Sequence, residues 1–63
     1  MFIRLTSCMT DSEVVININQ ISYFRSDLSD FRRTYVHLNS GTTIGVLEDL
    51  ETVMFRILEV SPR

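Results

Sequence analysis

The stretch Asn39–Glu59, NSGTTIGVLEDLETVMFRILE, decides the fold, because a turn, a strand and a helix follow one another within it. Its first residues, Asn39-Ser40-Gly41, tolerate positive φ angles and suit a tight connection between two strands. Thr42–Val46 is then expected to form the last strand of that hairpin.

An amphipathic helix is predicted to follow from Leu50 to Glu59. Asp49 is expected to cap it, since its carboxylate can accept hydrogen bonds from the free amides of the first turn. Glu51 adds favourable charge at the positive end of the helix dipole. We assign the acidic group Glu48, Asp49 and Glu51 to capping rather than to metal binding, because consecutive helical positions do not converge on one ion.

The expected core face of this helix is a stripe of apolar residues that recur at helical spacing. They are Leu50, Val53, Met54, Ile57 and Leu58. Phe55 lies beside the stripe, and we expect it to widen the buried surface. The alternative is that Phe55 is exposed and forms, with Phe2, an apolar patch for self-association.

Apolar periodicity predicts the earlier strands. Residues 2–6 alternate as a half-buried strand, and the β-branched segment Val14–Ile18 forms a second one. Ile21–Arg25 resumes the apolar pattern, and periodicity leaves open whether Tyr23 or Phe24 points inward.

A polar hairpin tip is predicted at Ser26–Asp30, with a returning strand that begins at about Phe31 or Arg33 and ends at Leu38. These elements predict one small α+β domain over residues 1–63. We expect four to five short antiparallel strands in a meander sheet, with one C-terminal amphipathic helix packed on it.

The chain has 63 residues, which is near the lower limit for burying enough apolar surface to fold alone. Cys8 is the only cysteine and His37 the only histidine, which excludes an intramolecular disulfide and a dedicated Cys/His zinc site. Oligomerisation is the remaining common source of stability, so we expect a homodimer or a larger homo-oligomer. We expect no cofactor and no metal.

A single thiol is typical of cytoplasmic proteins rather than of small secreted domains. Arg4 interrupts the apolar start that a signal peptide needs, and no segment approaches the ~20 apolar residues of a membrane span. We therefore expect a cytoplasmic protein with no membrane partner.

The fourth strand carries the candidate binding face. Alternation directs Val36 and Leu38 toward the core and leaves aromatic and basic residues on the other side. Further arginines lie near the loop that precedes this strand. The candidate binding residues are Arg25, Phe31, Arg32, Arg33, Tyr35 and His37.

Three interpretations of this face stay open. It could stack bases and hold phosphates, as sheet-based readers of single strands do. It could bind a protein, since Tyr, Phe and Arg are enriched at protein interfaces. It could also have no partner and simply stabilise the sheet through cross-strand pairs. The net charge of −2 argues against nucleic acid.

Catalytic motifs are missing from the sequence. Gly41 and Gly45 are the only glycines and the chain has no lysine, so it contains no phosphate-binding P-loop. Cys8 or a serine could pair with His37 as nucleophile and base, but nothing in the spacing of these residues supports such a pair. We therefore expect a protein that is not an enzyme.

The runs Ile16–Ile21 and Val36–Leu50 resemble the small FlbD-type flagellar and swarming motility proteins. In that family a strand ending in Asn leads to an Ile-bearing strand, then to a turn with Gly, and then to a Val-x-Glu-Ser segment that caps a final helix. The resemblance implies this order of elements and a role in motility.

The order of elements is also similar to the end of LytTR-type DNA-binding domains. It is similar as well to the carbon storage regulator family, whose five strands and C-terminal helix form intertwined dimers that bind RNA. Taken together, the sequence predicts a small, cytoplasmic, non-enzymatic protein that binds itself and an unknown partner protein. The alternative is a small regulator that binds RNA or DNA through the arginine and aromatic sheet face.

Overall fold

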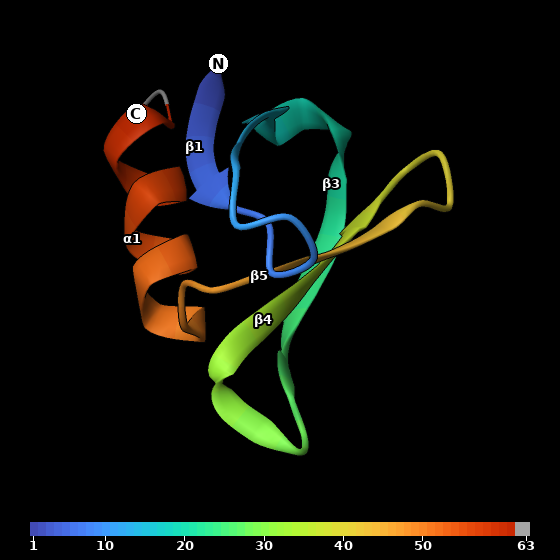
Figure 1. The fold of residues 1–63 in the computed structure, drawn as a ribbon. Coiled ribbons are helices and arrows are strands. Elements are labelled where there is room, and N and C mark those ends of the chain that lie inside the picture. The colour runs from blue at the N-terminus through green and yellow to red at the C-terminus, as the bar shows by residue number, and fades with distance from the viewer. Residues whose placement is uncertain (62–63) are drawn as a thin grey trace.

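Five antiparallel strands and one C-terminal helix make up the computed structural model of this protein, which describes residues 1–61 (Figure 1). The fold class is α+β, as predicted. The strands are β1 Phe2–Thr6, β2 Glu13–Asn17, β3 Ile21–Asp27, β4 Asp30–Leu38 and β5 Thr43–Val46. A short 3₁₀ turn, η1, covers Ile18–Gln20, and helix α1 covers Leu50–Val60.

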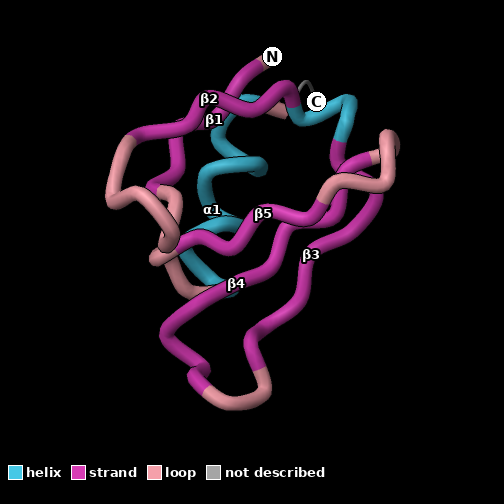
Figure 2. The backbone as a smooth tube through the Cα atoms, turned by 45° about the vertical axis from the view of Figure 1, so that its right-hand side comes forward, coloured by secondary structure: helices cyan, strands magenta, loops and turns pink. Residues whose placement is uncertain are grey.

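The strands form two small sheets, whereas the sequence suggested a single meander. β1 pairs with β2 in one sheet, and only β3, β4 and β5 form a meander (Figure 2). The break lies at η1, where Asn17 Oδ1 accepts a hydrogen bond from the backbone amide of Asn19 at 3.0 Å. This local bond favours a turn over continued strand pairing, so β2 and β3 do not become neighbours.

The end of β1 meets β5 instead. The amide of Leu47 donates to the carbonyl of Thr6, and the amide of Cys8 donates to the carbonyl of Gly45, each at 2.9 Å. These bonds, together with an isolated bridge between Ser7 and Val46, join the two sheets where β1 and β5 end.

Inward-facing residues of both sheets and one helical residue form the core. The buried apolar side chains are Ile3, Leu5, Ile16, Val36, Val46 and Val53. Phe24 packs against this core while Tyr23 is 56% exposed, which resolves the alternative that periodicity left open. Thr34 is also fully buried, and its hydroxyl donates to the carbonyl of Glu48 at 2.8 Å.

Helix α1 begins as predicted, because Asp49 Oδ1 accepts a hydrogen bond from the amide of Thr52 at 2.9 Å. The preceding turn is also as predicted, with Gly41 at a φ of +94°. Glu48 does not cap the helix, however, since its carboxylate turns back to Thr6 on β1. No helix among residues 1–61 is long and apolar enough to cross a bilayer.

The core face of the helix agrees only in part with the predicted one, since Val53 and Ile57 contribute to it as predicted. Val53 is fully buried and Ile57 and Val60 pack beside it, but Met54 and Leu58 are exposed. Phe55 is 69% exposed, so the expectation that it widens the buried stripe is wrong.

The contacts of Arg56 explain why Met54 and Leu58 lie outside the core. Its Nη1 atom donates to Glu48 Oε2 at 3.3 Å and to the carbonyl of Arg4 on β1. Arg56 therefore turns toward the sheet, and the opposite side of the helix, with Met54 and Leu58, turns outward.

Candidate functional site

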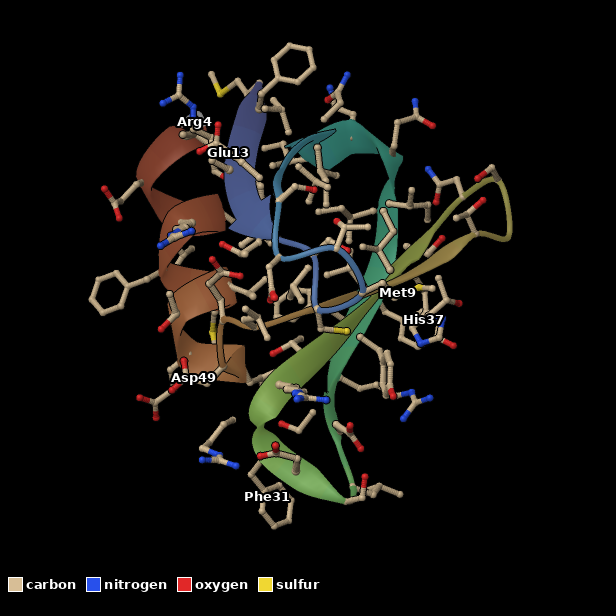
Figure 3. The ribbon with its side chains drawn as sticks, viewed as in Figure 1. Arg4, Met9, Glu13, Phe31, His37 and Asp49 are labelled. Atoms are coloured by element: carbon tan, nitrogen blue, oxygen red, sulfur yellow. The ribbon has the colours of Figure 1, made fainter. Side chains whose placement is uncertain are left out.

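Four side chains meet on the outer surface of the three-stranded sheet. The register of β3 and β4 places Tyr23 opposite His37 and Arg25 opposite Tyr35. Figure 3 shows His37 on the opposite side of the molecule from α1. We call the surface formed by Tyr23, Arg25, Tyr35 and His37 the aromatic face.

Ring stacking forms one half of the aromatic face. The rings of Tyr23 and His37 are nearly parallel, at 16°, with their centroids 4.3 Å apart. This separation is slightly shorter than the roughly 4.5–7 Å that is usual for attractive aromatic pairs, so the two rings are in direct contact. The outer surface of Tyr23 stays open to solvent.

Arg25 forms the other half. Its Nε donates to His37 Nε2 at 3.2 Å, and its guanidinium carbon lies 5.1 Å from the centroid of the Tyr35 ring. A cation over an aromatic ring at this distance is attracted by the ring's negative face. These two contacts favour one position of the guanidinium on the surface of the sheet.

The hydrogen bonds of His37 define its tautomer. An arginine can only donate, so His37 Nε2 must accept from Arg25 and carry no proton. The ring is then neutral, with its proton on Nδ1, which lies 3.0 Å from Thr43 Oγ1. Both ring nitrogens are engaged within the sheet.

Gly45 on β5 allows side chains to lie closely over this part of the sheet. A Cβ atom at this position would be 2.7 Å from Cys8 Sγ and 3.3 Å from Cε1 of Tyr35. A larger residue would displace the thiol or the Tyr35 ring. Gly45 thus helps to set the position of the aromatic face.

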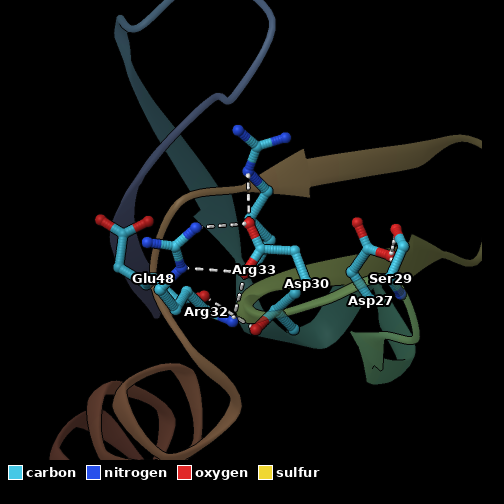
Figure 4. A network of polar contacts seen from close by, with 7 residues as sticks. Asp27, Ser29, Asp30, Arg32, Arg33 and Glu48 are labelled. Carbon is cyan, nitrogen blue, oxygen red and sulfur yellow. Dashed lines mark hydrogen bonds and ion pairs between the residues drawn. The ribbon is translucent and has the colours of Figure 1, made fainter.

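The remaining predicted residues, Phe31, Arg32 and Arg33, lie at the tip of the β3–β4 hairpin. Phe31 is exposed at its end (Figure 3). Arg32 Nε lies 3.0 Å from Asp30 Oδ1, and Arg33 Nε lies 3.7 Å from Asp30 Oδ2 (Figure 4). Hydrogen bonds from Arg32, together with the charges of both arginines, hold the pKa of Asp30 below its usual value of 3.8. The single carboxylate of Asp30 therefore offsets one of the two positive charges of Arg32 and Arg33.

The structure thus brings together Arg25, Tyr35 and His37 and places the other three predicted residues at the hairpin tip. Tyr23 and Thr43 were missed by sequence reasoning. Both belong to strands adjacent to β4, and the signal that identifies them is the cross-strand register rather than any local motif.

The described residues contain no group of three His, Cys, Asp or Glu side chains arranged to hold a metal ion. Comparison of the chain with protein-family models, with curated proteins and with solved structures gives no match.

Proposed function

We propose that this small protein is a non-enzymatic, cytoplasmic binding module that uses the aromatic face to bind an acidic surface of a partner protein. The observation that carries the proposal is the state of Arg25. Its guanidinium is positioned by Tyr35 and His37, and within residues 1–61 no carboxylate pairs with it.

Such an arginine is suited to receive a carboxylate. Within residues 1–61 its side chain donates only through Nε, so the two terminal nitrogens can form a bidentate pair with an aspartate or a glutamate. Preorganisation lowers the entropy cost of binding, because the side chain is already ordered. Arginine and tyrosine are also the residue types that most often dominate interface energy.

Catalysis by His37 has little support. Both of its ring nitrogens are engaged, with Arg25 and with Thr43. Neither nitrogen is free to take a proton from a nucleophile, and this favours a binding role.

Nucleic acid binding is the second candidate, because the exposed ring of Tyr23 offers a surface on which a base could stack. Arg32 and Arg33 could reach phosphates from the same hairpin. Two observations argue against nucleic acid binding. Both arginines are paired with Asp30, and the chain carries a net charge of −2, whereas binding to phosphates requires free positive charge.

A titration followed by amide chemical shifts tests the proposal. The probes are an acidic peptide of alternating Glu and Leu and a matched peptide with Gln in place of Glu. We expect shifts in β3 and β4 with the acidic peptide only, and their loss in Arg25→Gln. The variant Arg4→Gln, which removes an exposed arginine from β1, serves as the matched control and should bind normally.

Single-stranded RNA and DNA of random sequence form the second arm. Binding of these probes, with affinity that falls steeply as salt rises, would replace the proposal by its alternative. Equal binding of the two peptides would overturn the proposed role of Arg25.

A further inference from the structure

A second surface lies on the outer side of α1. A shallow groove there is lined by Glu51, Met54, Phe55 and Leu58, which are spaced as one face of a helix. Phe55 is 69% exposed and Leu58 is 59% exposed, which is unusual for large apolar residues grouped on one helix. We call this surface the helix groove.

The helix groove is acidic as well as apolar. Glu51 lies within it and is exposed. Arg56 is the only cation in Leu50–Val60, and it points toward Glu48 at 3.3 Å rather than into the groove. The groove therefore presents one carboxylate beside an apolar surface, and no cation of its own helix neutralises this carboxylate.

The aromatic face and the helix groove are complementary in chemistry. One offers an ordered arginine among aromatic rings, and the other offers a carboxylate among Met54, Phe55 and Leu58. An Arg25–Glu51 pair would form within an apolar surround, where exclusion of water strengthens a charge-assisted hydrogen bond. Met54 and Phe55 could pack against the exposed ring of Tyr23.

We propose that the helix groove of one copy of this chain binds the aromatic face of a second copy. The proposal rests on the proposed function, since it names the acidic surface that the aromatic face binds. It also identifies a source for the added stability that a chain of 63 residues needs.

Contact between unlike surfaces is favoured over contact between like surfaces. Two aromatic faces would bring Arg25 against Arg25, and two helix grooves would bring Glu51 against Glu51. Like charges in an interface cost free energy, and unlike charges fix the pairing. His37 of the aromatic face and helix α1 also lie on opposite sides of the molecule (Figure 3). The contact is therefore head-to-tail, and it builds a ring or an open chain of copies.

The test uses variants that block one surface each. Arg25→Glu blocks the aromatic face, and Phe55→Glu blocks the helix groove. Light scattering measures the mass from about 10 μM to about 1 mM, a range that reveals weak interfaces. We expect the wild-type mass to rise with concentration above 7.3 kDa, and each variant alone to stay at 7.3 kDa.

The 1:1 mixture of the two variants gives the decisive result. One copy then retains a normal helix groove and the other a normal aromatic face, so a single intact contact can form. The remaining two surfaces both carry an introduced carboxylate, from Arg25→Glu on one copy and Phe55→Glu on the other, and they repel each other. We expect a mass of twice the monomer and no further growth.

Arg4→Glu and Val15→Glu are the matched controls, because both positions are exposed on the other sheet, and both variants should associate like the wild type. Circular dichroism confirms that each variant is folded. A wild-type mass of 7.3 kDa at every concentration would overturn the inference, while leaving the acidic-peptide test of the proposed function intact. Dimers of Arg25→Glu alone, or a mixture that stays monomeric, would overturn it as well.

Discussion

The carboxylate of Glu48 accepts two hydrogen bonds from Thr6, one from the backbone amide at 2.9 Å and one from the hydroxyl at 3.0 Å. Thr6 ends β1, and Glu48 lies in the loop that leads into α1. Arg56 adds a third contact at 3.3 Å. This one side chain thus links the first strand, the last loop and the helix.

Removal of the Glu48 carboxylate should destabilise the protein. Glu48→Ala leaves the amide and hydroxyl of Thr6 and the guanidinium of Arg56 without their partner, and we expect a loss of about 2 kcal/mol in the free energy of unfolding. Urea denaturation measures it. Glu59→Ala, at an exposed helix position, is the control and should change stability by less than about 0.5 kcal/mol. A similar cost for both variants would contradict the role assigned to Glu48.

The contribution of Glu48 should also depend on pH. Burial raises the pKa of this carboxyl, but the hydrogen bonds from Thr6 and the charge of Arg56 outweigh it, and the net pKa lies below the usual 4.5. A lowered pKa in the folded state means that the stabilisation is fully present above pH 4.5 and is lost as the pH falls through the folded value. Wild type and Glu48→Gln should therefore differ at pH 7 and converge in acid. If the difference in the free energy of unfolding between the two proteins grew toward low pH, the pKa of Glu48 would be raised by folding rather than lowered.

The imidazole of His37 should carry its proton on Nδ1 at neutral pH. The reason is the hydrogen bond that Arg25 Nε donates to Nε2 at 3.2 Å. Long-range proton–nitrogen correlation spectra distinguish the two tautomers directly. Arg25→Ala removes the donor and should allow the other tautomer to appear. Observation of a proton on Nε2 as the main form in the wild type would rule out this network.

A methyl group at position 45 should collide with Cys8. Gly45→Ala places Cβ 2.7 Å from Cys8 Sγ, so the thiol or the strand must shift. Overpacking of this kind costs about 1–3 kcal/mol. Cys8→Ala removes the sulfur, and the double variant should recover most of the loss in a double-mutant cycle measured by urea denaturation. If Gly45→Ala cost the same free energy in the wild type and in Cys8→Ala, the collision with Cys8 would not be the cause of the destabilisation.

Part of the candidate site could be predicted from alternation along one strand. Tyr35 and His37 are two residues apart on β4, so they share a face whatever their neighbours are. Arg25 and Tyr23 join them only because the register of β3 places them opposite those residues. Register depends on pairing between segments, and the irregularities between Ile21 and Tyr23 and between Ser26 and Asp27 shift it further from what periodicity predicts.

The sequence alone determined the structural features that depend only on residues close together in the chain. The Asp49 cap, the turn with positive φ at Gly41 and the period of two in residues 2–6 are local properties of the backbone, and each lies where the sequence predicts it. The tertiary structure decided how those elements face one another. Glu48 contacts both Thr6 and Arg56, so Arg56 faces the sheet and Phe55 faces solvent. The turn at η1 divides the strands into two sheets. Thr6 and Glu48 are 42 positions apart, and no local pattern encodes a contact at that separation.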